Sequence, residues 1–102
     1  MKQSLEKTFS ICNEIDELLA NAMPQADDHR LRRIAFLANE LKGFDSYITR
    51  NADRLVSRAG IYLSARKHQS EQGGADGVMR EMRSSLLRAI RDQAQILEAG
   101  ST

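Results

Sequence analysis

The sequence predicts an all-α protein built as a bundle of helices, and three observations support this prediction. Apolar residues recur at helical spacing along most of the 102 residues. The chain has one proline and few β-branched residues, which disfavours a sheet. Large apolar residues also stand seven positions apart in the centre of the chain, which is the spacing of a helix packed lengthwise on another helix. They are Ile34, Leu41, Ile48, Leu55 and Tyr62.

The first predicted helix spans about residues 4–23. Ser4 can cap its amino end, and Pro24 ends it because proline cannot donate a backbone hydrogen bond. Apolar residues form one stripe along it, namely Leu5, Phe9, Cys12, Ile15, Leu19 and Met23. Because Cys12 lies in this stripe, we expect a buried apolar side chain there rather than a reactive thiol.

The second predicted helix is the longest and covers about residues 27–68, with Asp27 or Asp28 as its N-cap. The seven-residue series passes through Gly43 without a change of phase, which favours a continuous or mildly kinked helix. Such a helix would be about 63 Å long, which is too long for one compact chain of this size to cover. In the alternative, Gly43 ends the first half, Asp45 or Ser46 caps a new helix, and the chain folds as a four-helix monomer.

The third predicted helix covers about residues 76–98 and follows a loop at 69–75 that contains two consecutive glycines. Each outer helix would cover half of the central one, so the fold predicted for this single domain of residues 1–102 is three antiparallel helices. Pairing into a homodimer would complete a four-helix bundle at either end. The residues predicted to form the core and dimer seam are Ile34, Leu37, Leu41, Phe44, Ile48, Leu55 and Tyr62.

Charge is unevenly distributed along the chain, although the net charge is only +1. Residues 29–68 carry +6, whereas residues 1–28 carry −4 and residues 69–102 carry −1. In one interpretation the acidic first helix pairs with the basic central helix. In the other, a basic surface receives an anionic partner. The candidate partner surface consists of Arg50, Arg54 and Arg58, at four-residue spacing, with Arg66 and Lys67 beyond them.

The segment Ala38-Asn39-Glu40-Leu41-Lys42-Gly43 resembles the A-H-x-L-K-G motif of histidine phosphotransfer domains. In that family the histidine carries the phosphoryl group on a four-helix bundle. Asn39 stands at the histidine position, and Phe44 and Asp45 replace the small residues that follow the glycine. The match covers six residues, and what it implies is a relative that cannot carry the phosphoryl group itself.

The remaining patterns bear on the class of function. No nucleophile–base order, metal-ligand spacing or nucleotide-binding loop is found, so we expect no enzyme, no cofactor and no metal. No signal peptide or membrane span is predicted, and a single cysteine fits a reducing, cytoplasmic compartment. We therefore predict a homodimeric, non-enzymatic regulator or adaptor that binds, and could sequester, a protein partner. The alternative is a nucleic-acid-binding accessory protein that uses the basic stripe of the central helix.

Overall fold

Helices form almost the whole of the computed structural model, which describes residues 5–43 and 45–100 and contains no strand within them. The elements in order are α1 (Leu5–Ala20), α2 (Asp28–Asn39), α3 (Ser46–Tyr62), the 3₁₀ helix η1 (Lys67–Ser70), α4 (Gly74–Arg80), the π-helical turn η2 (Glu81–Leu86) and α5 (Leu87–Gly100). α4, η2 and α5 follow one another with helical backbone at each junction. They therefore act as one rod, and the bundle has four antiparallel rods.

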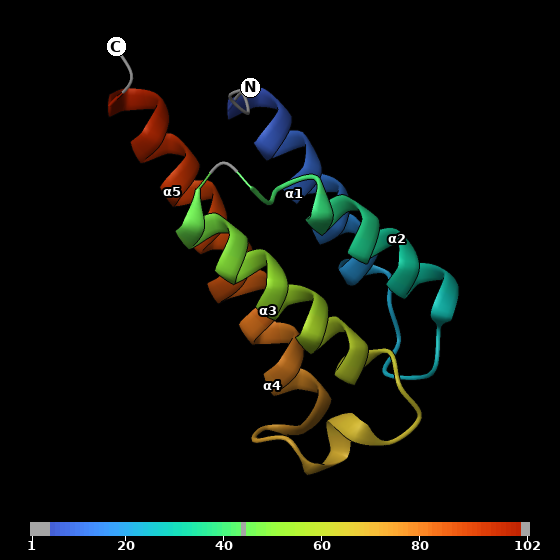
Figure 1. Cartoon of the computed structure of the whole chain (residues 1–102). Helices are drawn as coiled ribbons and strands as arrows, with labels where there is room; N and C mark the ends of the chain where they lie inside the picture. The colour runs from blue at the N-terminus through green and yellow to red at the C-terminus, as the bar shows by residue number, and fades with distance from the viewer. Residues whose placement is uncertain (1–4, 44, 101–102) are drawn as a thin grey trace.

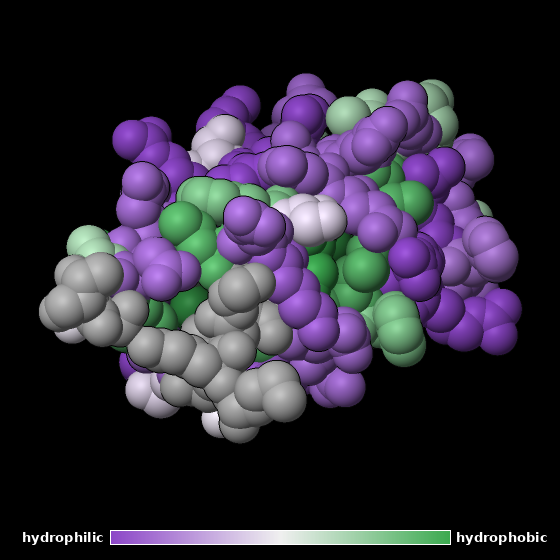
Figure 2. Space-filling model, turned by 90° about the horizontal axis from the view of Figure 1, so that it is seen from above, coloured by the Kyte–Doolittle hydropathy of each residue, from purple (hydrophilic) through white to green (hydrophobic). Residues whose placement is uncertain are grey.

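The four rods are arranged in a ring in which each contacts its two neighbours (Figure 1). α1 lies beside α2, α2 beside α3, α3 beside α5, and α5 beside α1. The radius of gyration is 13.6 Å. Apolar side chains from all four rods form one core. Viewed from the end where both termini lie, hydrophilic residues cover most of the outline, and apolar residues are visible inside it (Figure 2).

The predicted continuous helix over residues 27–68 is wrong, because α2 ends at Asn39 and α3 begins at Ser46. Gly43 has φ +103°, a value that favours glycine, and so the chain can turn there. Its amide donates to Thr49 Oγ1 at 3.0 Å. Asp45 then caps α3, its carboxylate accepting from the Ile48 amide at 2.9 Å. The four-helix alternative describes this corner, and the helix count of three is corrected to four.

The unbroken apolar series misled the prediction because both helices face the same core. Ile34 and Leu41 lie before the corner and Ile48 and Leu55 after it, and all four side chains are fully buried. The link happens to preserve the seven-residue phase while it reverses the chain direction. Periodicity therefore reports which residues face the core, but it does not report whether one helix or two present them.

The core and dimer seam predicted from the sequence lies largely inside one chain. Ile34, Leu37, Leu41, Ile48, Leu55 and Tyr62 are all buried in the core of the single chain. Phe44, the seventh member, lies outside the described residues. Any pairing of two copies must therefore use other side chains.

The remaining boundaries differ from the predictions by a few residues. α1 ends at Ala20 rather than residue 23, and the rod that begins at Gly74 reaches Gly100 rather than residue 98. The predicted Ser4 cap lies outside the described residues. The turn η2 was not predicted; it inserts one wide turn, and buried residues lie before, within and after it, at Val78, Met82 and Leu87. No helix in the described part of the chain is long and apolar enough to cross a membrane.

Candidate protein-binding face between α3 and α5

A groove of about 290 Å³ lies between the start of α3 and the middle of α5. We call it the α3–α5 groove. Its lining residues are Tyr47, Ser85, Arg88, Ala89, Asp92, Gln93 and Ile96. They come from α3, η2 and α5, so the groove follows the line where two antiparallel rods meet.

Two large apolar side chains in this groove are left in solvent. Tyr47 is 43% exposed and Ile96 is 64% exposed. Tyr47 directly precedes the buried Ile48, so the helical turn directs it away from the core. Ile90 and Ala94 fix the buried side of α5, and Ile96 falls on the outer side. Both side chains are therefore exposed as a consequence of the same core packing.

Charged side chains border the groove. The Arg88 Nε lies 3.8 Å from Asp92 Oδ2, one turn along the same helix, and both side chains are exposed. Such an exposed pair contributes little to folding stability. Arg50, one turn after Tyr47, is exposed, and no carboxylate of residues 5–43 or 45–100 pairs with it. Among its described lining residues, the groove itself therefore carries one acid and one cation, and a second cation, Arg50, lies beside it along α3.

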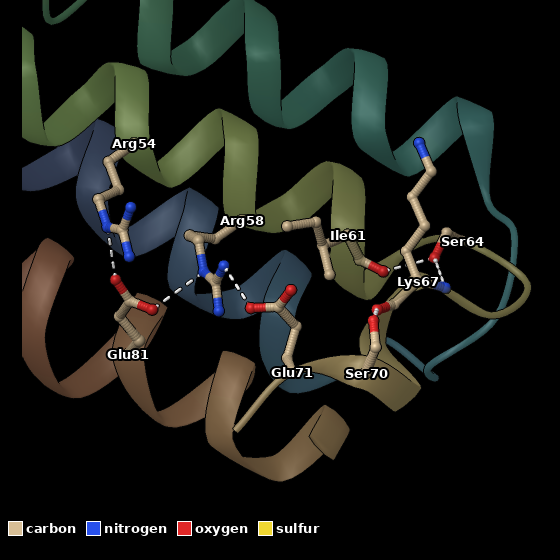
Figure 3. A network of polar contacts seen from close by, with 8 residues as sticks. All are labelled: Arg54, Arg58, Ile61, Ser64, Lys67, Ser70, Glu71 and Glu81. Atoms are coloured by element: carbon tan, nitrogen blue, oxygen red, sulfur yellow. Dashed lines mark hydrogen bonds and ion pairs between the residues drawn. The ribbon is translucent and has the colours of Figure 1, made fainter. Parts of the chain in front are cut away.

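Further along the same junction, four charged side chains form a network beside a cavity of about 470 Å³ (Figure 3). Arg54 Nε donates to Glu81 Oε2 at 2.7 Å. Arg58 Nη1 lies 2.9 Å from Glu71 Oε1, and Arg58 Nε lies 2.9 Å from Glu81 Oε1 without the alignment of a hydrogen bond. The Arg58 side chain is only 12% exposed, so this network ties α3 to the last rod.

The five basic residues of the candidate partner surface do not form one surface. Arg54 and Arg58 lie together, but Glu71 and Glu81 neutralise them. Arg50 borders a different hollow, near the Gly43 corner. The other two are exposed past the end of α3, where Arg66 precedes η1 and Lys67 is its first residue.

Sequence reasoning missed Tyr47, Ile96, Arg88 and Asp92. A signal was present for Ile96, because it lies off the apolar stripe of the last helix, one turn after the polar Asp92 and Gln93. Tyr47 gave no such signal, because it fell inside the predicted continuous helix. Only the corner at Gly43 shows that it starts a new helix beside α5.

The buried thiol of Cys12 and the buried imidazole of His68 are packed within the fold. Cys12 is fully buried, and burial raises the pKa of its thiol to about 11, against the opposing effect of Arg91. His68 is also buried; its Nε2 lies 3.1 Å from the Pro24 carbonyl, which links η1 to the turn between α1 and α2. Within the described ranges no group of three acidic, histidine or cysteine side chains is placed to hold a metal ion.

The segment that resembles the phosphotransfer motif lies at the end of α2 and at the corner after it. Ala38 and Leu41 are buried, whereas Asn39, at the histidine position, is exposed as the last residue of the helix. An amide side chain has no nucleophilic nitrogen to accept a phosphoryl group. Comparisons with protein-family models, with curated proteins and with solved structures each found no match.

Proposed function

We propose that this protein is a small, non-enzymatic adaptor or regulator that acts by binding another protein in the α3–α5 groove. The observation that carries the proposal is the exposure of Tyr47 and Ile96 together at one groove. Exposed apolar side chains that lie together, with a polar border, are typical of protein-binding sites. Tyrosine is also among the residues that contribute most to binding energy at interfaces.

The shape and charge of the groove indicate the chemistry of the partner segment. A groove between two antiparallel helices suits an amphipathic helix, which would place its apolar side chains against Tyr47, Ala89 and Ile96. Arg88 lines the groove and Arg50 lines the neighbouring hollow near the Gly43 corner, so acidic residues on the flanks of the partner helix would speed association. We therefore expect an amphipathic helix with acidic flanks rather than a basic one.

Site-specific photo-crosslinking in the organism of origin tests this proposal. A photoreactive amino acid would replace Tyr47, and in a matched control it would replace Phe36, which is 57% exposed on α2. We expect a stoichiometric adduct from position 47 alone, and mass spectrometry should map it to a helical, acid-flanked segment of one protein. The adduct should disappear when Ile96→Asp is added and persist when Arg32→Asp, on α2, is added instead.

The proposal fails if position 47 gives no adduct that position 36 does not also give. It fails equally if the adduct at position 47 is insensitive to Ile96→Asp, because the groove would then not be what holds the partner. Circular dichroism of the Ile96→Asp variant must show wild-type helicity, and we expect this because the side chain is mostly in solvent.

Nucleic-acid binding is the second candidate function. The observation that favours it is that Arg50, Arg66 and Lys67 are exposed, with no ion pair to a carboxylate in the described part of the chain. Against it, Arg54 and Arg58 are already neutralised by carboxylates. Binding to duplex DNA or to RNA should then depend steeply on salt, and Arg50→Ala should reduce the salt slope by about one unit. No binding at low salt would exclude it.

A further inference from the structure

We infer that a second copy of this chain occupies the α3–α5 groove when the protein partner is absent. The two α5 helices would pack antiparallel about a two-fold axis, so that self-association and partner binding exclude each other. This inference rests on the proposed function only in that both assign the same groove. It also places the dimer on a surface other than the predicted seam, which lies in the core of one chain.

The charges on the exposed side of α5 are complementary to those of a second α5 that runs in the opposite direction. Arg88 and Asp92 are one turn apart, both exposed, and only loosely paired within the chain at 3.8 Å. In an antiparallel pair with its axis near residues 90 and 91, Arg88 of each copy comes within reach of Asp92 of the other. The two-fold axis then creates two equivalent ion pairs. This is the pattern of an isologous interface, in which the same surface of both copies is used.

The apolar groups also fit this arrangement. About the same axis, Ile96 of one copy lies over Ser85 of the other, and the small Ala89 lies near the middle of the contact. Small side chains at these two positions leave room for Ile96 to enter the groove beside Tyr47 of the other copy. Both large exposed apolar groups of this face are then covered in both copies.

The size of the contact sets its strength. The stretch from residue 85 to residue 100 is about 24 Å long, which limits the pair to a small interface of less than about 1,200 Å². Interfaces of that size are typical of transient complexes. We therefore expect a dissociation constant on the order of 10–100 µM, weak enough for a protein partner to displace the second copy.

Sedimentation equilibrium between about 5 µM and 1 mM tests this inference. The wild type should shift from monomer to dimer across that range. Arg88→Asp should weaken the dimer about tenfold, because it places like charges against each other twice. The double variant Arg88→Asp, Asp92→Arg restores complementarity with the signs exchanged, and it should recover most of the wild-type affinity.

A wild type that stays monomeric at 1 mM overturns the inference. So does an Arg88→Asp variant that dimerises as well as wild type, or a double variant that is no better than the single one. Because both side chains are exposed, misfolding should not intervene. Equal unfolding midpoints of all three proteins at 5 µM would confirm that only association has changed.

The outcomes separate the two proposals. If the chain is monomeric but the crosslink from position 47 still depends on Ile96, the groove binds a partner and only the self-association inference fails. If the chain dimerises through Arg88 and Asp92 but no other protein is crosslinked, the proposed function fails and the dimer stands. If a synthetic peptide of the crosslinked segment shifts the dimer to monomer, both proposals are supported.

Discussion

Exposed apolar side chains lie on two outer faces of the bundle, α1–α2 and α3–α5, and the two faces differ in whether another side chain covers them. On the α1–α2 face, the Arg33 guanidinium lies 5.4 Å from the centre of the Phe36 ring. Two hydrogen bonds to one oxygen of Glu14, at 2.9 Å and 2.7 Å, hold that guanidinium in place. On the α3–α5 face, no comparable cover lies over Tyr47 or Ile96 among the described contacts.

The difference shows that exposure alone does not identify a binding surface. Phe36 is about as exposed as Ile96, but a cation over its face already makes the contact that a partner would offer. Tyr47 and Ile96 have no such contact with a described residue and can still make one with a partner, and they lie at one groove.

The largest effect is expected when a buried cation is removed from the α3–α5 side. Arg58→Met leaves Glu71 and Glu81 with one partner fewer, and it should reduce the free energy of unfolding by about 2 kcal/mol. The equivalent change on the other side, Arg33→Met, breaks an exposed pair with Glu14 and should cost less than about 1 kcal/mol. Urea unfolding at 25 °C measures both values.

Salt provides the control for this first prediction. The cost of Arg33→Met should fall at 1 M NaCl because exposed pairs are screened, whereas the cost of Arg58→Met should persist. Equal costs at both salt concentrations would contradict the distinction between the two faces.

A smaller effect is expected at the corner that joins the two halves. Gly43 has φ +103°, so Gly43→Ala should lower stability by about 1–2 kcal/mol. Gly60 lies inside α3 with no atom within 4 Å of an added Cβ, and Gly60→Ala should raise stability by about 0.5–1 kcal/mol. Thermal unfolding measures both. A gain from Gly43→Ala would indicate the continuous helix instead.

These two glycines also show how much of the fold the sequence could predict. Helical content and the core-facing positions follow from spacing, because burial of Ile34, Ile48 and Leu55 requires it. The sequence does not say which glycine breaks a helix. That depends on whether backbone amides freed by the break find hydrogen bonds elsewhere. Here the Thr49 hydroxyl and the Asp45 carboxylate accept them.

The candidate site was less predictable than the core. A basic stripe is visible in sequence, but whether Arg54 and Arg58 are free depends on Glu81, 27 residues away from Arg54. Likewise, Tyr47 and Ile96 are 49 residues apart, and only the packing of α3 on α5 brings them to one groove. Long-range pairings of this kind leave no local pattern.

The pH dependence of stability gives a still smaller effect, on the α1–α2 side. The Arg30 amide, and then its guanidinium, donate to Asp27 and hold the pKa of that carboxyl below its ordinary value of 3.8. The lowered pKa contributes stability that is complete above the ordinary value and is lost as the pH falls through the folded-state value. Urea midpoints of wild type should therefore approach those of Asp27→Asn below about pH 4. A constant difference from pH 7 to pH 3 would contradict this.

The smallest effect on folding is expected from the exposed apolar side chains themselves, and it sharpens the comparison most. Ile96→Ser should change the free energy of unfolding by less than about 0.5 kcal/mol, because most of the side chain is already in solvent. Phe36→Ser should cost about 0.5 kcal/mol more, since it also removes the contact with Arg33. Both are measured at 5 µM, where most of the protein is expected to be monomeric.

Binding should reverse that order. Ile96→Ser, nearly neutral for folding, should abolish the crosslink from position 47 and weaken dimerisation, whereas Phe36→Ser should leave both unchanged. Replacing a side chain that only packs within the chain would lower stability and binding together. Opposite rankings in the two measurements are the expected result if Phe36 already has its contact within the chain and Ile96 obtains one from another molecule.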